Sequence, residues 1–290
     1  MKDKYFISIV GKSNVGKSTF INYLCNQYIT SESNKPQTTR INIVAETKID
    51  NFSLILIDTP GLSVKDSNLL SATMKKSYLK SLENLDLLII LTDITKTKKF
   101  ENSILEMINN NTKTLIVVNK IDLLVENIKE YKKHINTVLD EQVFYISLKQ
   151  QIGLKDLIEN GIKKELVSIK NKSNNKINNK VNELITIQEL IRGIVVNNTR
   201  EEIPYDTAVK INKSINQKLI HKIDASIYVE KTNQRKILIG NKGNMIKLIG
   251  SQSREILEEK YNKKFYLKLN VCVKKDWKNN FSFLKEIGYL

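Results

Sequence analysis

The sequence predicts an α/β fold in two domains: a larger domain with a mostly parallel sheet and helices on both faces, and a smaller α+β domain. Three observations lead to this prediction. Short apolar runs alternate with segments of helical spacing up to about residue 166. A polar stretch rich in lysine and asparagine then interrupts the pattern at residues 168–180. The chain of 290 residues is also long enough to bury two cores.

Six apolar runs in the first part have the length and residue types of buried strands. Nearly continuous apolar strands separated by helices are typical of a parallel sheet covered on both faces. The second and third runs are too close for a crossover helix, so we expect an antiparallel hairpin at one edge. The predicted strands are residues 5–10, 42–49, 53–57, 87–92, 114–118 and 143–146, and the predicted helices lie near 17–26, 66–83, 100–110, 126–139 and 153–166.

The second part of the chain has fewer and differently ordered elements. We predict domains at residues 1–167 and 184–290, joined by a linker at 168–183. Thr186 to Glu189 fits a capping box, which predicts a helix over 186–197. The pattern then predicts two strands, two consecutive helices, a third strand and a short final helix, with the strands at 207–212, 224–231 and 265–273.

Positive charge is concentrated in the second domain. Residues 168–290 contain 24 lysines and arginines against 12 acidic residues, a net charge of +12 out of +16 for the whole chain. Nucleic acid or an anionic membrane surface are the usual partners of such a region, although charge alone also serves solubility. The two distant cysteines and two isolated histidines form no metal-binding pattern. The N-terminus has no secretory signal pattern and no apolar run reaches the length of a membrane span, so we expect a cytosolic protein.

The strongest motif is a glycine-rich phosphate-binding loop. Residues 11–18 match G-x-x-x-x-G-K-[ST] between a predicted strand and a predicted helix, which is the context that the motif requires. Backbone N–H groups of such a loop point at a phosphate. Lys17 is expected to reach the β- and γ-phosphates and Ser18 to bind Mg²⁺. The predicted nucleotide-binding residues of this region are Gly11, Lys12, Ser13, Asn14, Val15, Gly16, Lys17, Ser18 and Thr19.

A second phosphate-site motif, Asp58-Thr59-Pro60-Gly61, follows the predicted strand 53–57. The carboxyl ends of strands in such sheets are where ligands bind. Asp58 can hold Mg²⁺, and the N–H of Gly61 can approach the γ-phosphate because no side chain obstructs it.

The sequence Asn119-Lys120-Ile121-Asp122 indicates guanine specificity. A carboxylate only accepts hydrogen bonds, and guanine presents two donors on one edge, whereas adenine presents an acceptor there. Lys120 can cover the base with its alkyl stem. The segment Ser147-Leu148-Lys149 follows the strand 143–146 and is placed to support the base.

Residues 35–40, Lys-Pro-Gln-Thr-Thr-Arg, lie between the first helix and the second strand. A threonine in this segment reaches Mg²⁺ only when the segment folds over the γ-phosphate, which is the basis of a nucleotide switch. We expect Thr39 in this role, with Thr38 as the alternative.

Leu62 follows the second motif, at the position where Ras-like GTPases have a water-orienting glutamine. Leucine cannot orient water, so hydrolysis requires another group or a partner. In potassium-activated GTPases an asparagine of the phosphate loop helps to hold a monovalent cation, and Asn14 occupies that place. The expected catalytic residues are therefore Lys17, Asn14 and Thr39, with K⁺ as a possible cofactor beside GTP and Mg²⁺.

The basic domain contains a G-x-x-G loop, Gly240-Asn241-Lys242-Gly243, between two segments of helical spacing. In a KH domain this loop clamps about four nucleotides of single-stranded RNA, and glycine is needed because two backbones lie in contact. The combination of the loop, the flanking elements and the charge predicts RNA binding. The predicted RNA-binding residues are Arg235, Lys236, Gly240, Asn241, Lys242, Gly243 and Lys247.

The order of these parts resembles the Era family, in which a P-loop GTPase domain precedes one KH-type domain. Besides the nucleotide motifs, the resemblance includes segments 188–192, 199–204 and 239–249, Trp277, Leu284 and residues 287–289. The sequence departs from the family pattern at Ser13, where proline is usual, at Asn241, where glycine is usual, and in the linker.

The resemblance implies a GTPase that binds the 3′ end of small-subunit ribosomal RNA, assists maturation of the small subunit and associates weakly with the membrane. Two alternatives have sequence arguments of their own. One is a related GTPase that acts on another RNA, in tRNA modification or large-subunit assembly. The other is an RNA-binding adapter with little intrinsic hydrolysis, which the leucine at position 62 leaves open.

Overall fold

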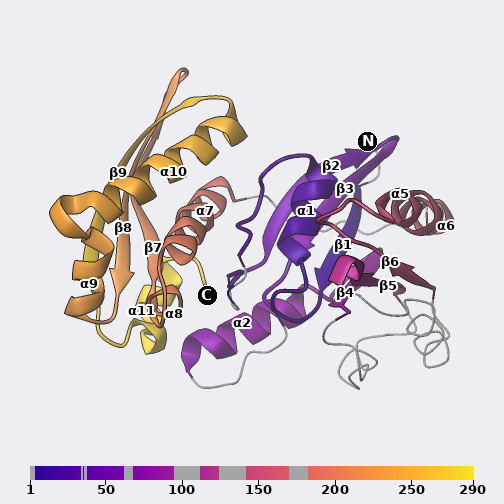
Figure 1. The fold of residues 1–290 in the computed structure, drawn as a ribbon, viewed down its shortest axis with the longest axis horizontal. Coiled ribbons are helices and arrows are strands. Elements are labelled where there is room, and N and C mark those ends of the chain that lie inside the picture. The colour runs from indigo at the N-terminus through magenta and orange to yellow at the C-terminus, as the bar shows by residue number, and fades with distance from the viewer. Residues whose placement is uncertain are drawn as a thin grey trace.

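The computed structural model of the chain describes residues 4–33, 35, 38–61, 68–94, 112–123, 142–169 and 182–290. The described chain forms two lobes, one from residues up to 169 and one from residues after 182 (Figure 1). The predicted helices at 100–110 and 126–139, Leu62, Pro36, Gln37 and most of the predicted linker lie outside the described residues.

The first lobe contains a six-stranded sheet in the order β2-β3-β1-β4-β5-β6. All neighbouring strands are parallel except β2 and β3, which form the expected antiparallel hairpin at one edge. The mostly parallel fold with one antiparallel edge is thus confirmed. The strands are β1 (Lys4–Val10), β2 (Ile43–Ile49), β3 (Phe52–Asp58), β4 (Leu87–Asp93), β5 (Lys113–Asn119) and β6 (Val143–Tyr145).

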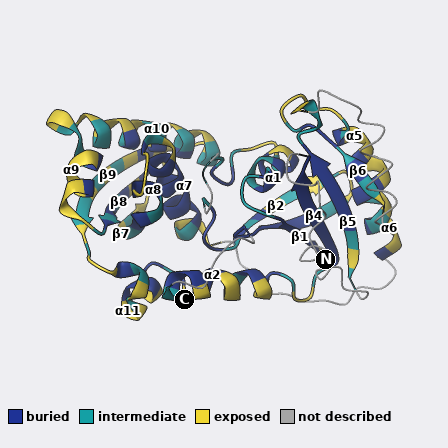
Figure 2. Cartoon of the chain, turned by 60° about the horizontal axis from the view of Figure 1, so that its bottom comes forward, coloured by how far each residue is buried: buried dark blue, intermediate teal, exposed yellow. Residues whose placement is uncertain are grey.

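The central strands are buried on both faces, and β4 is buried over its whole length. The edge strand β2 instead alternates between buried and more exposed residues, because one of its faces meets solvent. Figure 2 shows this contrast between the sheet and the partly exposed helices around it. The helices of this lobe are α1 (Lys17–Cys25), α2 (Leu69–Lys80), the short 3₁₀ helix η1 (Ile121–Leu123), and α5 (Leu154–Asp156), η2 (Leu157–Lys163) and α6 (Lys164–Ile169), which follow one another directly.

The second lobe has a three-stranded sheet in the order β7-β8-β9, with β7 antiparallel and β9 parallel to β8. Apolar residues of the helices α7, α9 and α10 pack with the sheet into one core. The elements are α7 (Glu183–Asn198), α8 (Ile203–Asp206), β7 (Ala208–Asn216), β8 (Ile220–Val229), α9 (Thr232–Ile239), η3 (Asn241–Gly243), α10 (Asn244–Tyr261), β9 (Lys264–Val273), η4 (Trp277–Asn279) and α11 (Phe281–Glu286).

The predicted capping box at Thr186 is wrong. Helix α7 begins one turn earlier, at Glu183, and Asn182 caps it by accepting a hydrogen bond from the N–H of Ile185. Thr186 lies inside the helix, where its hydroxyl donates to the carbonyl of Asn182. Glu189 is turned into the protein interior instead of back toward the helix start. Asparagine is as good a cap as threonine, so the residue types alone did not distinguish the two starts.

The two lobes share an apolar cluster. Ile41, Leu70 and Met74 of the first lobe pack with Trp277 and Phe283 of the second. Helix α2 accordingly extends below the second lobe toward α11 (Figures 1 and 2). The lobes therefore contact each other through packed side chains in addition to being covalently connected. Among the described helices, none has the length and apolar character needed to cross a membrane.

Candidate nucleotide site and KH-type loop

The phosphate-binding loop follows β1 and leads into α1, and its glycines are required by the space around them. Gly11 has φ +150° and Gly16 has φ +106°. A Cβ atom on Gly11 would lie 2.0 Å from the carbonyl oxygen of Leu91, and one on Gly16 would lie 2.6 Å from the side-chain nitrogen of Asn119. Any larger residue would force the loop away from the strands that support it.

Lys17 is the first residue of α1 and is buried, with 7% of its surface exposed. Its ammonium group donates to the carbonyl oxygens of Gly11 (3.1 Å) and Lys12 (2.8 Å), so it lies across the loop. A phosphate in the loop would meet this ammonium together with the N–H groups at the start of the helix. The arrangement is that of an anion-binding site.

Three oxygen-bearing side chains converge beside the loop. The Ser18 hydroxyl donates to Asp58 Oδ2 at 3.0 Å, the Thr39 hydroxyl donates to the same atom at 3.2 Å, and the two hydroxyl oxygens are 3.5 Å apart. The other carboxylate oxygen, Asp58 Oδ1, is buried without a hydrogen-bond partner among the described residues. Burial raises the pKa of Asp58, an effect that its hydroxyl partners and Lys17 oppose. A hard cation such as Mg²⁺ prefers this donor set and would neutralise the buried carboxylate, so the residues fit the ion.

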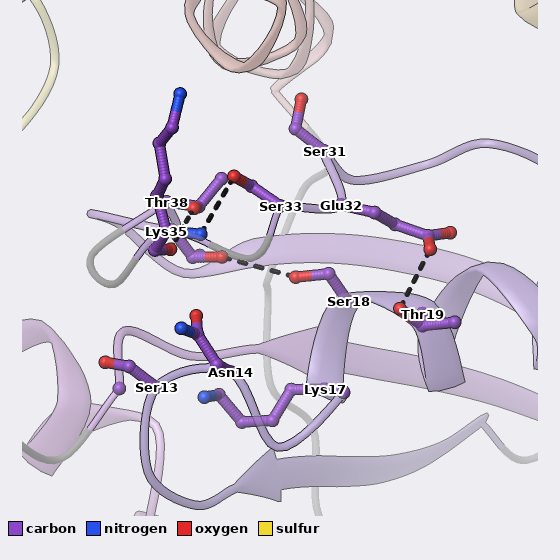
Figure 3. Close-up of a pocket in the computed structure, with 13 residues that line it drawn as sticks. Ser13, Asn14, Lys17, Ser18, Thr19, Ser31, Glu32, Ser33, Lys35 and Thr38 are labelled. Carbon is purple, nitrogen blue, oxygen red and sulfur yellow. Dashed lines mark hydrogen bonds between the residues drawn. The ribbon is translucent and has the colours of Figure 1, made fainter. Parts of the chain in front are cut away.

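The structure distinguishes the two threonines of the switch segment. Thr39 is buried and points at Asp58, whereas the hydroxyl of Thr38 donates to the carbonyl oxygen of Lys35. Figure 3 shows Ser13, Asn14 and Lys17 of the phosphate loop on one side of the pocket and Ser33, Lys35 and Thr38 on the other. Of the two threonines, Thr39 is therefore the one that lies beside Ser18 and Asp58, and its role toward Mg²⁺ stays a prediction.

The predicted base-binding residues lie at the end of β5 and on the loops after β5 and β6, and hydrogen bonds connect several of them. Ser147 donates its hydroxyl proton to Asp122 Oδ1 at 2.6 Å, which orients the carboxylate. The side chain of Asn119, at the end of β5, connects the loop after β6 to the phosphate loop. Its amide nitrogen donates to the carbonyl of Val15 (2.9 Å), and its amide oxygen accepts from the N–H of Leu148 (3.1 Å). Lys149 is exposed at the rim.

Several residues of the site were not predicted from the sequence. Thr30 donates its hydroxyl proton to Asp58 Oδ2 at 2.7 Å. Asp93 pairs with Lys120 at 3.1 Å, and the same ammonium donates to the carbonyl of Asn14 at 2.6 Å. Asp93 had a recognisable signal, since it is an acid at the end of a buried strand. Thr30 had none, because it belongs to an irregular segment whose path depends on tertiary contacts.

The remaining residues of the second motif support the loop. Thr59 donates to the carbonyl of Ile9 at 2.8 Å, which fixes the motif to β1. Gly61 approaches the phosphate loop so closely that a Cβ atom there would lie 2.5 Å from the Ser13 hydroxyl and 2.8 Å from the Ser13 nitrogen. Leu62 lies outside the described residues, so its role stays a prediction.

The G-x-x-G loop lies between α9 and α10, as predicted. Gly240, Lys242 and Gly243 all have positive φ angles, of 73°, 49° and 80°. A Cβ atom on Gly240 would lie 2.7 Å from the nitrogen of Met245, whereas one on Gly243 would meet only open space and the side chain of Ile246 at 3.9 Å. Gly240 is thus needed for the turn, and Gly243 leaves the loop surface open. The predicted basic residues around this loop are all exposed, namely Arg235, Lys236, Lys242 and Lys247.

The fold and the first site define a P-loop GTPase domain, followed by an α+β domain of the KH type. Comparison with protein-family profiles agrees: residues 6–120 match a family described as "50S ribosome-binding GTPase", and residues 202–278 match the KH domain.

Whole-chain relatives identify the family. The chain is 35% identical to GTPase Era of Lactobacillus helveticus, over 98% of this chain and 95% of that protein. It is 36% identical to GTPase Era of Thermotoga maritima, over 98% of this chain and 96% of that protein. The chain therefore belongs to the GTPase Era family and hydrolyses GTP.

Two solved structures have the same fold over the whole chain, each with a TM-score of 0.85 and 28% identity, and each covered to 99%. One is a variant of Era from Aquifex aeolicus bound to GDP and AlF₄⁻. The other is Era in complex with MgGDPNP and nucleotides 1506–1542 of 16S ribosomal RNA.

Proposed function

We propose that the chain is a GTP-controlled switch that binds the 3′ end of small-subunit ribosomal RNA and assists assembly of the small ribosomal subunit. The observation that carries this proposal is the whole-chain likeness to an Era structure that contains nucleotides 1506–1542 of 16S ribosomal RNA. The open, basic G-x-x-G loop supports it, because such a loop accommodates a single-stranded sugar–phosphate backbone.

Within the nucleotide site, we propose that residues 11–19 hold the phosphates, that Ser18, Thr39 and Asp58 hold Mg²⁺, and that Asp122 reads guanine. The ion, when bound, supplies positive charge that offsets the charge of the phosphates. Lys17, which lies across the phosphate loop, adds a second positive charge. Thr39 closes the switch segment over the phosphates, which limits access of water.

We also propose that Asn14 helps to hold K⁺ against the phosphates. Asn14 has a positive φ of 67° and lines the pocket, and its side chain lies beside Lys17 in Figure 3. For the location of the protein, we propose the cytosol with weak peripheral attachment to the membrane through the basic domain.

A role on the large subunit is a second candidate, because the family profile that matches the first domain is described as binding the 50S ribosome. Ultraviolet crosslinking of the full chain to total ribosomal RNA, with the nucleotide site loaded with a non-hydrolysable GTP analogue, separates the two. We expect crosslinks at the 3′ end of small-subunit RNA. These crosslinks should disappear when an unlabelled strand of the same sequence is added as a competitor. Crosslinks confined to large-subunit RNA would favour the second candidate.

A further inference from the structure

The switch segment, residues 35–40, lies between the nucleotide site and the second domain. Of three consecutive residues in it, the middle one contacts the nucleotide site and the two outer ones contact the second domain. Thr39 faces Ser18 and Asp58. Its neighbour Thr38 accepts a hydrogen bond at its carbonyl oxygen from the guanidinium of Arg192, which belongs to α7 of the second domain. On the other side of Thr39, Arg40 extends into the second domain.

Arg40 is almost completely buried, with 1% of its surface exposed. Its guanidinium donates to three backbone carbonyls at the end of α8, with distances of 2.6 Å to Thr207, 2.7 Å to Tyr205 and 3.3 Å to Pro204. It also lies 5.5 Å from the centre of the Trp277 ring, where a cation is attracted by the ring face. The residue after Thr39 is therefore anchored entirely to the second domain.

Arg192 is held as firmly by its own domain. It is 1% exposed, and it donates to Glu189 Oε2 from Nη2 at 2.6 Å and from Nε at 2.9 Å. The other oxygen of Glu189 accepts from the Tyr289 hydroxyl at 2.7 Å. With both carboxylate oxygens engaged, Glu189 fixes the plane of the guanidinium, and this plane determines where Thr38 is held.

Helix α7 also contacts Ser31, Glu32 and Lys35, at the beginning of the switch segment and just before it, over about its last two turns. The Asn197 side chain donates to the carbonyl of Glu32 at 3.0 Å, and Lys35 donates to the carbonyls of Val196 and Thr199. Gly193, next to Arg192, has no room for a side chain, because a Cβ atom would lie 1.8 Å from the Ser31 hydroxyl oxygen. A glycine is required for this close approach, so the contact between α7 and the segment is built into the packing.

From this arrangement we infer that Arg192, held by Glu189 and Tyr289, is a positioning residue for the nucleotide site although it belongs to the other domain. The carbonyl that it binds is part of the peptide plane that leads into Thr39, and a planar peptide transmits its orientation to the next residue. Arg40, the residue after Thr39, is itself fixed by its hydrogen bonds to the second domain. Together they hold Thr39 where its hydroxyl meets Asp58 and Ser18. The inference rests on the proposed role of Thr39 in binding Mg²⁺ with GTP.

The test uses the full chain and measures the affinity for a fluorescent non-hydrolysable GTP analogue across a series of Mg²⁺ concentrations, with GDP measured in parallel. Arg192→Gln should raise the Mg²⁺ concentration needed for half-maximal analogue binding about tenfold, a common size for coupling between sites. GDP affinity should stay within about twofold of wild type, because GDP has no γ-phosphate for the switch segment to cover. Arg254→Gln, an exposed change of the same chemistry on α10, is the matched control.

Because Arg192→Gln leaves Glu189 buried without its cation, Tyr289→Phe serves as a milder second variant that removes one hydroxyl. It should move the Mg²⁺ requirement in the same direction by a smaller factor. Equal losses for GDP and the analogue in both variants, or no change in either, would overturn the inference.

Thr39→Ala separates this inference from the proposed function. If Thr39→Ala leaves the Mg²⁺ requirement unchanged, the proposed role of Thr39 is wrong, and the inference fails with it. If Thr39→Ala raises the requirement and Arg192→Gln does not, only the inference is wrong. If both act through one contact, the double variant should be no worse than Thr39→Ala alone, because coupled residues are not additive.

Discussion

The nucleotide site and the G-x-x-G loop, both predicted to bind phosphate groups, are built in opposite ways. In the nucleotide site the functional side chains are buried or partly buried, and they are bonded to one another: Ser147 donates to Asp122, Asn119 joins two loops, and Ser18 and Thr39 meet at Asp58. Around the G-x-x-G loop the basic side chains are exposed, and the glycines of the loop supply a backbone shape.

This difference determines what a substitution can do. A change in the first site removes a specific hydrogen bond from a buried network, where a lost partner is costly. A change in the second alters the local shape or charge and leaves in place the diffuse attraction of residues 168–290, which have a net charge of +12. We therefore expect large, specific effects in the first site and smaller, salt-dependent effects in the second.

The largest effect is expected for Asp122→Asn. An amide cannot accept from both guanine donors, so GTP affinity should fall about 100-fold or more, as is typical when a buried polar group loses its partner. Binding of a xanthine nucleotide should improve, because that base has a carbonyl in place of the amine. Titration with fluorescent GTP, XTP and ATP analogues measures the change, and wild-type protein that bound ATP as tightly as GTP would contradict the assignment.

At the G-x-x-G loop, Gly243→Asp places a negative charge where the RNA backbone is expected, in a space that accepts a side chain. The preference for a short strand ending like small-subunit ribosomal RNA over a scrambled strand should fall about 30-fold, which corresponds to roughly 2 kcal/mol of repulsion between like charges in contact. Nonspecific binding and GTP binding should persist.

Gly243→Asn is the matched control for this change. Asparagine has nearly the same shape, is neutral, and tolerates the positive φ of 80° at this position. It should retain most of the preference across a salt series. An equal loss in both variants would show that shape, and not charge, decides binding at this loop.

Potassium should have an effect of intermediate size. If Asn14 helps to hold K⁺, replacing sodium by potassium at equal ionic strength should accelerate single-turnover hydrolysis about tenfold, which corresponds to 1.4 kcal/mol in the barrier. Asn14→Ala should remove the difference while GDP binding is retained. Equal rates of the wild-type protein in the two salts would rule out this role.

The smallest effect is expected for Ser147→Ala, which removes a single neutral hydroxyl from the carboxylate of Asp122. Guanine affinity should fall about fivefold, the value of one hydrogen bond of roughly 1 kcal/mol. Isothermal titration with GDP measures it, and Ser168→Ala, at an exposed serine, is the control. A loss as large as that of Asp122→Asn would show that Ser147 contacts the base itself.

Much of the first domain follows from the sequence, because its strands are local apolar patterns. The strands predicted at 87–92 and 114–118 match β4 and β5 to within one residue at each end. Neighbouring parallel strands also bring their carboxyl ends together, so motifs that are far apart in the chain could be assigned to one site.

The contacts between the domains could not be predicted in this way. Arg40 follows a polar segment and Arg192 lies among apolar residues of a predicted helix, and neither local pattern shows which groups its guanidinium meets. The carbonyls that Arg40 binds belong to the other domain. Arg192 pairs with Glu189 one helical turn away, but the carbonyl of Thr38 that it binds lies across the domain interface. The short helix α8 was missed for a related reason: it is one turn long and has no periodicity to detect.

The close contact between Gly193 and Ser31 has a consequence for how sequences of this kind can diverge. A Cβ atom at position 193 would overlap both the hydroxyl oxygen and the Cβ atom of Ser31, so an alanine at 193 is acceptable only if residue 31 becomes glycine or the helix moves. The two positions belong to different domains, yet they cannot drift independently. An exchange of the second domain between distant relatives should therefore succeed more often when residue 31 is transferred with it.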